Sequence, residues 1–86
     1  MFEVILSPDA GAFYVDADGP LARKLARCFA QLEREPHRHG NIKRLTGELS
    51  GRFRYRVGDW RVLYRVDEAA ERVIVLVIAH RSEVYE

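Results

Sequence analysis

The sequence predicts an α+β fold in which two N-terminal helices pack on one face of a four-stranded, antiparallel-type sheet. One strand-like stretch opens the chain, two helical patterns follow it, and three alternating stretches occupy the second half. The chain of 86 residues is of the size of a single domain, 1–86, and its 48% apolar residues suffice for one core. Because each helix must bury its apolar stripe against the sheet, both helices are expected on the same face.

The opening segment predicts a strand that leads directly into a helix. Within residues 2–7 apolar side chains recur at alternate positions, and Pro8 ends the stretch. Ser7 followed by Pro8 is typical of a helix start, with serine as N-cap and proline at the first helical position. The first helix is therefore predicted from residue 8 to about residue 15.

The second helix is predicted from residue 20 to about residue 35. Its apolar residues fall at steps of 4, 3, 1 and 3 and so form one stripe: Leu21, Leu25, Cys28, Phe29 and Leu32. Pro36 ends the helical pattern. Residues 37–51, polar and basic with three glycines, are predicted to form a long connection without a strand.

The second half predicts a three-stranded antiparallel meander. Residues 53–57 and 60–66 alternate apolar with mostly basic side chains, and Gly58 and Asp59 form the turn between them. A second turn follows at 67–71. Residues 73–79 are apolar on both faces, which predicts a central strand.

Positive charge is concentrated in the middle of the chain. The net charge is only +1, but residues 38–65 carry +6, whereas residues 1–37 carry −2 and residues 66–86 carry −3. A polyanion would therefore meet the middle third.

The alternation of the two strands places several arginines on one face of the sheet. If the apolar residues point to the core, Arg54 and Arg56 on one strand and Arg61 and Arg65 on the next all point outward. Like charges this close destabilise a sheet, which indicates an anion site. The alternative is an ordinary solvated sheet face whose arginine stems cover apolar surface.

Other residue types narrow the classes of site. Because Cys28 is the one cysteine, no disulfide can form within the chain, which fits a reducing cytoplasm. Cys28 is better interpreted as a small buried hydrophobe than as a reactive thiol. His37 and His39 have no cysteine or carboxylate cluster nearby, so neither a metal nor another cofactor is expected. Neither a signal peptide nor a membrane segment is expected.

Three segments together resemble the RelE/ParE superfamily of bacterial and archaeal toxin–antitoxin systems, RelE-like branch. The segments are 43–47 (KRLTG), 54–64 (RYRVGDWRVLY) and 80–85 (HRSEVY). Each is weak alone, but the combination is specific, and the resemblance covers the whole length of the chain, including the predicted order of elements.

The resemblance implies a toxin that is a metal-independent endoribonuclease, cleaving mRNA in the ribosomal A site and so inhibiting translation. The 2′-OH would attack the adjacent phosphate and leave a 2′,3′-cyclic phosphate. Arg61 would clamp the scissile phosphate, Arg81 would add charge to the transition state, and Tyr85 would orient the substrate base. The general base would be His80, the leading candidate, or Tyr85, because some relatives carry lysines where Arg54 and Arg56 stand and arginine cannot serve as a base.

Further basic residues are expected to bind RNA phosphates through the same resemblance: Lys43, Arg44, Arg54, Arg56 and Arg65. The expected partners are a cognate antitoxin, the ribosome and mRNA, in the cytoplasm, while homodimerisation is left open. Two alternatives remain at this stage. The chain could be a ParE-like toxin that inhibits DNA gyrase by protein binding, or a degenerate homologue that only binds its antitoxin.

Overall fold

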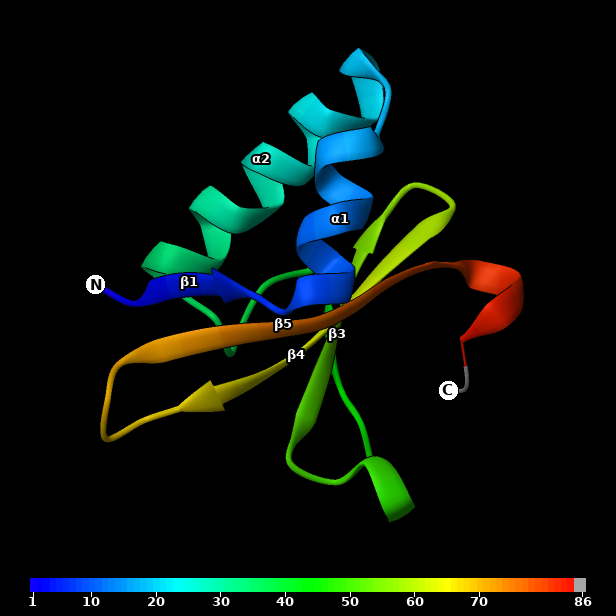
Figure 1. Cartoon of the computed structure of the whole chain (residues 1–86). Helices are drawn as coiled ribbons and strands as arrows, with labels where there is room; N and C mark the ends of the chain where they lie inside the picture. Colours follow the sequence, from blue (N-terminus) through cyan, green and yellow to red (C-terminus); the bar gives the residue numbers. More distant parts are fainter. Residues whose placement is uncertain (85–86) are drawn as a thin grey trace.

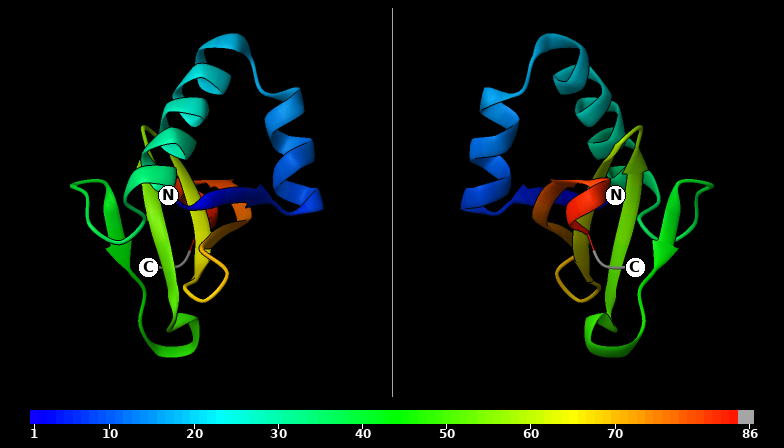
Figure 2. Two further views of the ribbon diagram at one scale, coloured as in Figure 1. Left: turned by 90° about the vertical axis from the view of Figure 1, so that its left-hand side faces the viewer. Right: turned by 90° about the vertical axis from the view of Figure 1, so that its right-hand side faces the viewer.

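The fold consists of two layers, a helical hairpin and a sheet. The computed structural model describes residues 1–84, so Tyr85 lies outside the described residues. Both helices lie on the same side of the sheet, as Figures 1 and 2 show. The predicted fold class and the side on which the helices pack are confirmed.

The elements follow the predicted order with one strand added between the second helix and the meander. In chain order they are β1 (Glu3–Leu6), α1 (Pro8–Asp16), α2 (Gly19–Arg34), β2 (Ile42–Arg44), the 3₁₀ helix η1 (Gly47–Leu49), β3 (Arg52–Val57), β4 (Trp60–Asp67), β5 (Arg72–His80) and the 3₁₀ helix η2 (Arg81–Glu83).

The sheet has five strands in the order β1-β5-β4-β3-β2, rather than the predicted four. β2 was not predicted, because three residues are too few to show an alternation and because it falls inside the segment predicted as a connection. β1 runs parallel to β5, whereas all other pairs are antiparallel. β5 is an interior strand, paired on both sides, although β4 is the middle strand of the sheet.

The first helix begins at the Ser7–Pro8 signal that predicted it, and the second begins one residue before the predicted start, with Asp18 as its N-cap. The hydroxyl of Ser7 accepts a hydrogen bond from the backbone N–H of Ala10 at 3.1 Å and donates one to the carbonyl of Leu76 at 2.8 Å. The carboxylate of Asp18 accepts one from the N–H of Leu21 at 2.9 Å. These caps provide acceptors for backbone N–H groups that have no partner within the first turn of a helix. The hydrogen bond from Ser7 to Leu76 also joins the start of α1 to β5.

The core lies between α2 and the helix-facing side of β3, β4 and β5. It is formed by buried residues of all four elements: Leu25, Cys28, Leu32, Phe53, Tyr55, Val62, Tyr64, Val73 and Val75. The hydroxyl of Tyr64 donates a buried hydrogen bond of 2.8 Å to the carbonyl of Pro36, which joins β4 to the segment after α2. Burying each large apolar side chain stabilises the fold by roughly 1.5–3 kcal/mol.

A β-bulge in β5 reverses which face its last residues occupy. Leu63 pairs with Val77 but Tyr64 pairs with Val75, so Leu76 is an extra residue on β5. Before the bulge the odd-numbered residues of β5 face the helices; after it, the even-numbered ones do. Val77 therefore lies on the face opposite the helices, and His80 lies on the helix-facing side.

Within residues 1–84, no helix has the length and apolar character required to cross a membrane.

Candidate functional site

The face of the sheet opposite the helices, here called the outer face, carries a group of three arginines. Arg54 and Arg56 project from β3, and Arg61 projects from β4 directly opposite Arg56. Neighbouring strands lie about 4.8 Å apart, so the three side chains share one small area. We call Arg54, Arg56 and Arg61 the arginine cluster. The sequence predicted this arrangement from alternation alone.

The electrostatics of the cluster favour an anion. The pKa of Arg54 lies below its usual range, first because the side chain is partly desolvated and then because of the positive charges of Arg61 and Arg56. Such mutual repulsion is relieved when a phosphate or carboxylate binds among the guanidinium groups.

Arg61 is held in place by the turn between β3 and β4. Only 7% of the residue is exposed. One terminal nitrogen, Nη1, donates to the carbonyl of Gly58 at 2.8 Å and to that of Trp60 at 3.0 Å. Gly58 has a φ of +58°, a conformation that glycine adopts without strain. The Gly58–Asp59 turn therefore fixes the orientation of the Arg61 guanidinium.

A shallow apolar groove lies beside the arginine cluster on the outer face. It has a volume of about 210 Å³ and is lined by residues of η1, β4, β5 and the C-terminal segment: Leu49, Leu63, Val77, Ala79, Glu83 and Val84. Leu63 pairs with Arg54, and Ala79 pairs with Arg61. This outer groove and the arginine cluster therefore form one continuous site.

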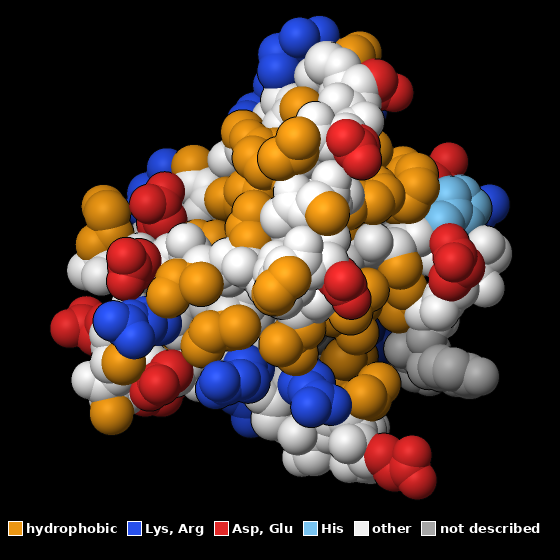
Figure 3. All heavy atoms as spheres, in the orientation of Figure 1, with side chains coloured by type: hydrophobic (Ala, Val, Ile, Leu, Met, Phe, Trp, Pro, Cys, Tyr) orange, Lys and Arg blue, Asp and Glu red, His pale blue; other side chains and the backbone are white. Residues whose placement is uncertain are grey.

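An exposed apolar surface runs along the same region of the sheet. Val77 is 44% exposed and Ile5 is 37% exposed. Figure 3 shows hydrophobic side chains gathered where β5 crosses the molecule, with Lys and Arg side chains along the lower border of this area. Exposed apolar side chains and basic side chains thus lie next to one another in this view.

The remaining predicted phosphate-binding residues divide between the two faces. Lys43 lies on the outer face, paired with Arg54. Arg65 shares that face but stands four residues, about 13 Å, from Arg61 along β4. Arg44 does not join them, because its guanidinium lies 5.4 Å from the centre of the Phe53 ring on the helix-facing side. The expectation for Arg44 is therefore not supported by its position.

His80 does not lie beside the arginine cluster, where a general base would be expected. It pairs with Trp60, and the two rings meet edge to face with centroids 5.3 Å apart. Its Nδ1 accepts the backbone N–H of Ser82 at 3.2 Å and lies 2.9 Å from the Ser82 hydroxyl. The bulge in β5 causes the discrepancy, because uninterrupted alternation after the buried Val75 would place residue 80 on the outer face.

Arg81 lies at the end of the sheet, next to the same turn that holds Arg61. Its backbone N–H donates to the carbonyl of Asp59 at 2.8 Å, and its Nε lies 3.7 Å from the Asp59 carboxylate. Arg81 thus attaches η2 to the β3–β4 turn.

The groove residues were missed in the sequence. Val77 and Ala79 belong to an apolar run that predicts burial on both faces, and Glu83 stands among polar tail residues. An apolar strand end followed by a carboxylate carries no specific signal, so the outer groove could be recognised only in the structure.

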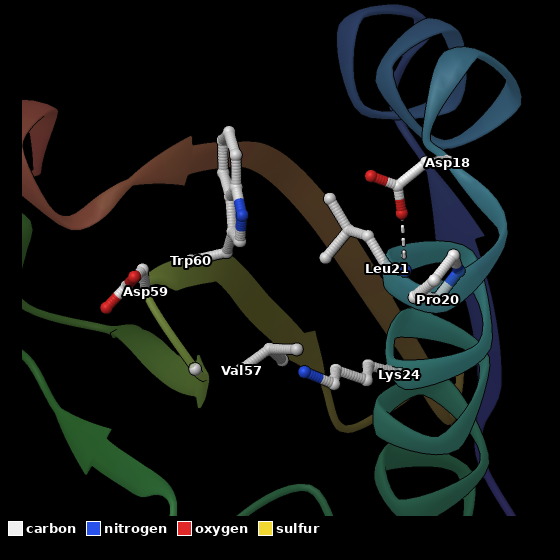
Figure 4. Close-up of a pocket in the computed structure, with 8 residues that line it drawn as sticks. Asp18, Pro20, Leu21, Lys24, Val57, Asp59 and Trp60 are labelled. Carbon is white, nitrogen blue, oxygen red and sulfur yellow. Dashed lines mark hydrogen bonds between the residues drawn. The ribbon is translucent and has the colours of Figure 1, made fainter.

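A second cavity of about 240 Å³ lies between the first turn of α2 and the β3–β4 turn. Its walls include Leu21, Val57 and Trp60, and Figure 4 shows the Lys24 side chain extending from α2 toward Val57. Asp18 at its rim caps α2. This cavity is separate from the arginine cluster.

Residues 1–84 contain no group of three or more His, Cys, Asp or Glu side chains that could hold an ion. The site therefore consists of guanidinium groups, apolar side chains and one carboxylate.

The fold and the sequence both match known toxins. Residues 4–85 match the family described as the ParE toxin of the type II toxin–antitoxin system parDE. The toxin RelG of Mycobacterium tuberculosis is 42% identical over 65 residues, which cover 76% of this chain and 72% of RelG. The chain belongs to the RelE/ParE superfamily of type II toxins.

Solved structures of RelE/ParE toxins share the fold over nearly the whole chain. The toxin–antitoxin complex RelBE2 of M. tuberculosis superposes with a TM-score of 0.81 at 30% identity, covering 93% of this chain and 98% of the matched chain. The archaeal RelE–RelB complex of Pyrococcus horikoshii gives 0.82 at 22% identity, covering 96% and 98%, which shows the fold alone. This RelE/ParE toxin thus has the two helices and the sheet of its relatives.

Proposed function

We propose that this toxin is a metal-independent endoribonuclease that cleaves mRNA in the ribosomal A site and thereby inhibits translation. The observation that carries the proposal is the arginine cluster: three guanidinium groups on adjacent strands, beside a groove, on a face that the helices leave uncovered. The 42% identity between this chain and RelG over 65 residues is consistent with a toxin of the RelE type.

The cluster suits the charge that develops during RNA cleavage. A base must take the proton of the 2′-OH as its oxygen attacks the adjacent phosphorus, which forms a pentacoordinate phosphorane with additional negative charge. The bond from phosphorus to the 5′ oxygen then breaks, the 5′ oxygen takes up a proton and leaves as a hydroxyl, and a 2′,3′-cyclic phosphate remains. One guanidinium group can donate two parallel hydrogen bonds to two oxygens of a phosphate, and it keeps its charge at any physiological pH. Arg54 and Arg56 would contact the scissile phosphate, and Arg61, oriented by its bonds to the turn, would complete the anion site.

The position of His80 argues against its role as general base. Its ring lies against Trp60 on the helix-facing side, while the arginine cluster lies on the outer face. We therefore assign most of the rate enhancement to electrostatic stabilisation by the cluster, which in other enzymes is commonly the largest contribution. Arg81, held beside Asp59, and Tyr85 remain candidates from the sequence resemblance alone.

A cognate antitoxin is the expected partner. The structural relatives include toxin–antitoxin complexes, among them RelBE2 and the YoeB–YefM complex of Staphylococcus aureus. We propose that an antitoxin segment covers the outer face, its acidic residues neutralising the arginine cluster. A flexible acidic segment that orders on binding would suit this surface.

A second candidate function is favoured by one observation. The family that matches residues 4–85 is described as the ParE toxin of the parDE system. The chain could accordingly act as a ParE-like toxin that inhibits DNA gyrase by protein binding and performs no chemistry.

Induction of the toxin and its variants in cells tests these functions. Under the nuclease proposal, induction stops protein synthesis and yields cleaved transcripts, and Arg56→Gln lowers the cleavage rate on ribosomes by roughly 100-fold. Arg27→Gln is the matched control, because it removes the same charge from the exposed face of α2.

Two outcomes would contradict the proposal. Filamentation and an SOS response with intact transcripts would indicate gyrase inhibition instead. Equal loss of cleavage in Arg56→Gln and Arg27→Gln would show that net charge, rather than the arginine cluster, is responsible.

A further inference from the structure

We propose that the outer groove is a nucleobase subsite and that Glu83 selects bases carrying an exocyclic amino group. The inference rests on the proposed nuclease function and adds a determinant of substrate preference. It follows from where the groove lies, what lines it and where its one carboxylate stands.

The outer groove lies next to the arginine cluster, so that one nucleotide could contact both. Leu63 in its floor pairs with Arg54, and Ala79 pairs with Arg61, so charged and apolar side chains alternate across neighbouring strands about 4.8 Å apart. A nucleotide whose phosphate lies among the guanidinium groups would project its ribose and base sideways along the sheet. The base of that nucleotide would then rest on Leu63 and Val77.

The lining of the groove fits a flat, uncharged ring better than a second phosphate. Its lining is mainly aliphatic, and Val77 is 44% exposed. A base that covers these side chains removes apolar surface from water, which favours binding. The carboxylate of Glu83 would repel a second phosphate, so the site has cations for the phosphate and apolar surface for the base.

Glu83 is the one charged side chain that lines the outer groove within residues 1–84. A carboxylate accepts hydrogen bonds and donates none, so it pairs with the N4 amino group of cytosine. Uracil has nearly the same shape but carries a carbonyl oxygen at that position, which a carboxylate repels. The amino groups of adenine and guanine are donors of the same kind. The groove is therefore expected to accept bases with an amino group and to disfavour uracil.

Binding of small nucleotides by the toxin tests this inference without requiring cleavage. The probes are cytidine 3′-monophosphate, uridine 3′-monophosphate and ribose 3-phosphate, titrated into the isotope-labelled toxin and followed by NMR. We expect cytidine monophosphate to bind about tenfold more tightly than uridine monophosphate, as one charge-assisted hydrogen bond provides. Methyl resonances of Leu63 and Val77 should shift with the nucleotides but not with ribose phosphate.

Two variants separate the role of Glu83 from a general effect of charge. Glu83→Gln should bring the affinities for the two nucleotides within twofold of each other, because an amide can both donate and accept. Glu48→Gln removes the same charge from the exposed η1 turn, outside the groove lining, and should leave the preference for cytidine unchanged.

Several results would overturn the subsite. Equal affinity of the wild type for the two nucleotides, an unchanged preference in Glu83→Gln, or equally tight binding of ribose phosphate would each exclude it. The proposed function fails separately, if the toxin binds these nucleotides as expected but leaves transcripts intact. Conversely, cleaved transcripts without any preference among the nucleotides would contradict only the subsite.

Discussion

At the scale of single residues, burial determines how Cys28 behaves. The side chain lies in the core between α2 and the sheet, and burial raises the pKa of its thiol to about 12. The thiolate is the reactive form of cysteine, so a buried thiol with a raised pKa is inert. The structure thus supports the interpretation of Cys28 as a core residue.

Thiol labelling provides a test at this scale. At pH 8 the folded toxin should hold roughly a thousandfold less thiolate than a thiol of pKa 9.0, because the pKa of Cys28 is raised to about 12. Ellman's reagent should therefore react with the native protein only at the rate of its unfolding, and at once in urea. Rapid labelling of the native protein, without loss of secondary structure, would contradict the burial of this residue.

Residue identity also accounts for part of the site. Arg54, Arg56 and Arg61 were expected to form an anion site, because a guanidinium group binds phosphate and does not lose its proton. His80 shows the limit of such reasoning, since an imidazole that suits proton transfer stands on the helix-facing side against Trp60.

At the scale of elements, the turn between β3 and β4 organises the arginine cluster. The carbonyls of Gly58 and Trp60 accept the hydrogen bonds that hold Arg61. The carbonyl of Asp59 accepts one from the backbone N–H of Arg81, and the Asp59 carboxylate forms an ion pair with the Arg81 side chain. The conformation of this turn depends on the positive φ of Gly58. The turn thus couples the stability of the hairpin to the geometry of the anion site.

Replacement of Gly58 tests this coupling. Gly58→Ala should lower the free energy of unfolding by about 1–2 kcal/mol, because a Cβ is disfavoured in the left-handed region. It should also weaken phosphate binding, since the Arg61 guanidinium loses its fixed acceptors. Urea denaturation and a phosphate titration measure the two effects.

Gly40→Ala is the matched control for this substitution. Its backbone is not left-handed, and nothing lies within 4 Å of the added Cβ. This variant should be as stable as the wild type or slightly more so. Equal stability of both variants would show that the turn tolerates a side chain at position 58.

At the scale of the whole molecule, the charge distribution would determine how the toxin meets RNA under the proposed function. The net charge of +1 hides the excess of +6 over residues 38–65. The fold brings much of that excess to the outer face, where the arginine cluster, Lys43, Arg52 and Arg65 all project. Binding to RNA should therefore depend on this face and on ionic strength.

The salt dependence of RNA binding provides a test at this scale. For single-stranded RNA the slope of log K against log salt is roughly −0.7 for each phosphate neutralised. Arg54→Gln and Arg56→Gln should each reduce the slope by about that amount, and Arg27→Gln on α2 should not, as measured by fluorescence anisotropy with a short oligonucleotide. An equal reduction by all three substitutions would show that the net charge of the molecule, and not one face, controls binding.

Local patterns determined most of the secondary structure. Ser7 with Pro8 and Asp18 with Pro20 mark helix starts because side-chain oxygens cap backbone N–H groups within the same turn. The alternation in β3 and β4 placed the arginines on one face, because side chains of a strand point to opposite faces in turn. Such features depend on neighbours in the sequence and can be predicted from it.

The tertiary structure decided the features that depend on distant residues. The sequence does not show that β1 lies parallel to β5, that β2 completes the sheet, or that one extra residue in β5 exchanges the faces of Ala79 and His80. A bulge forms only when two strands pair, so no local pattern records it. By itself the sequence therefore determined which residues could bind an anion, whereas strand pairing determined which of them meet, what groove lies beside them and that the histidine is not among them.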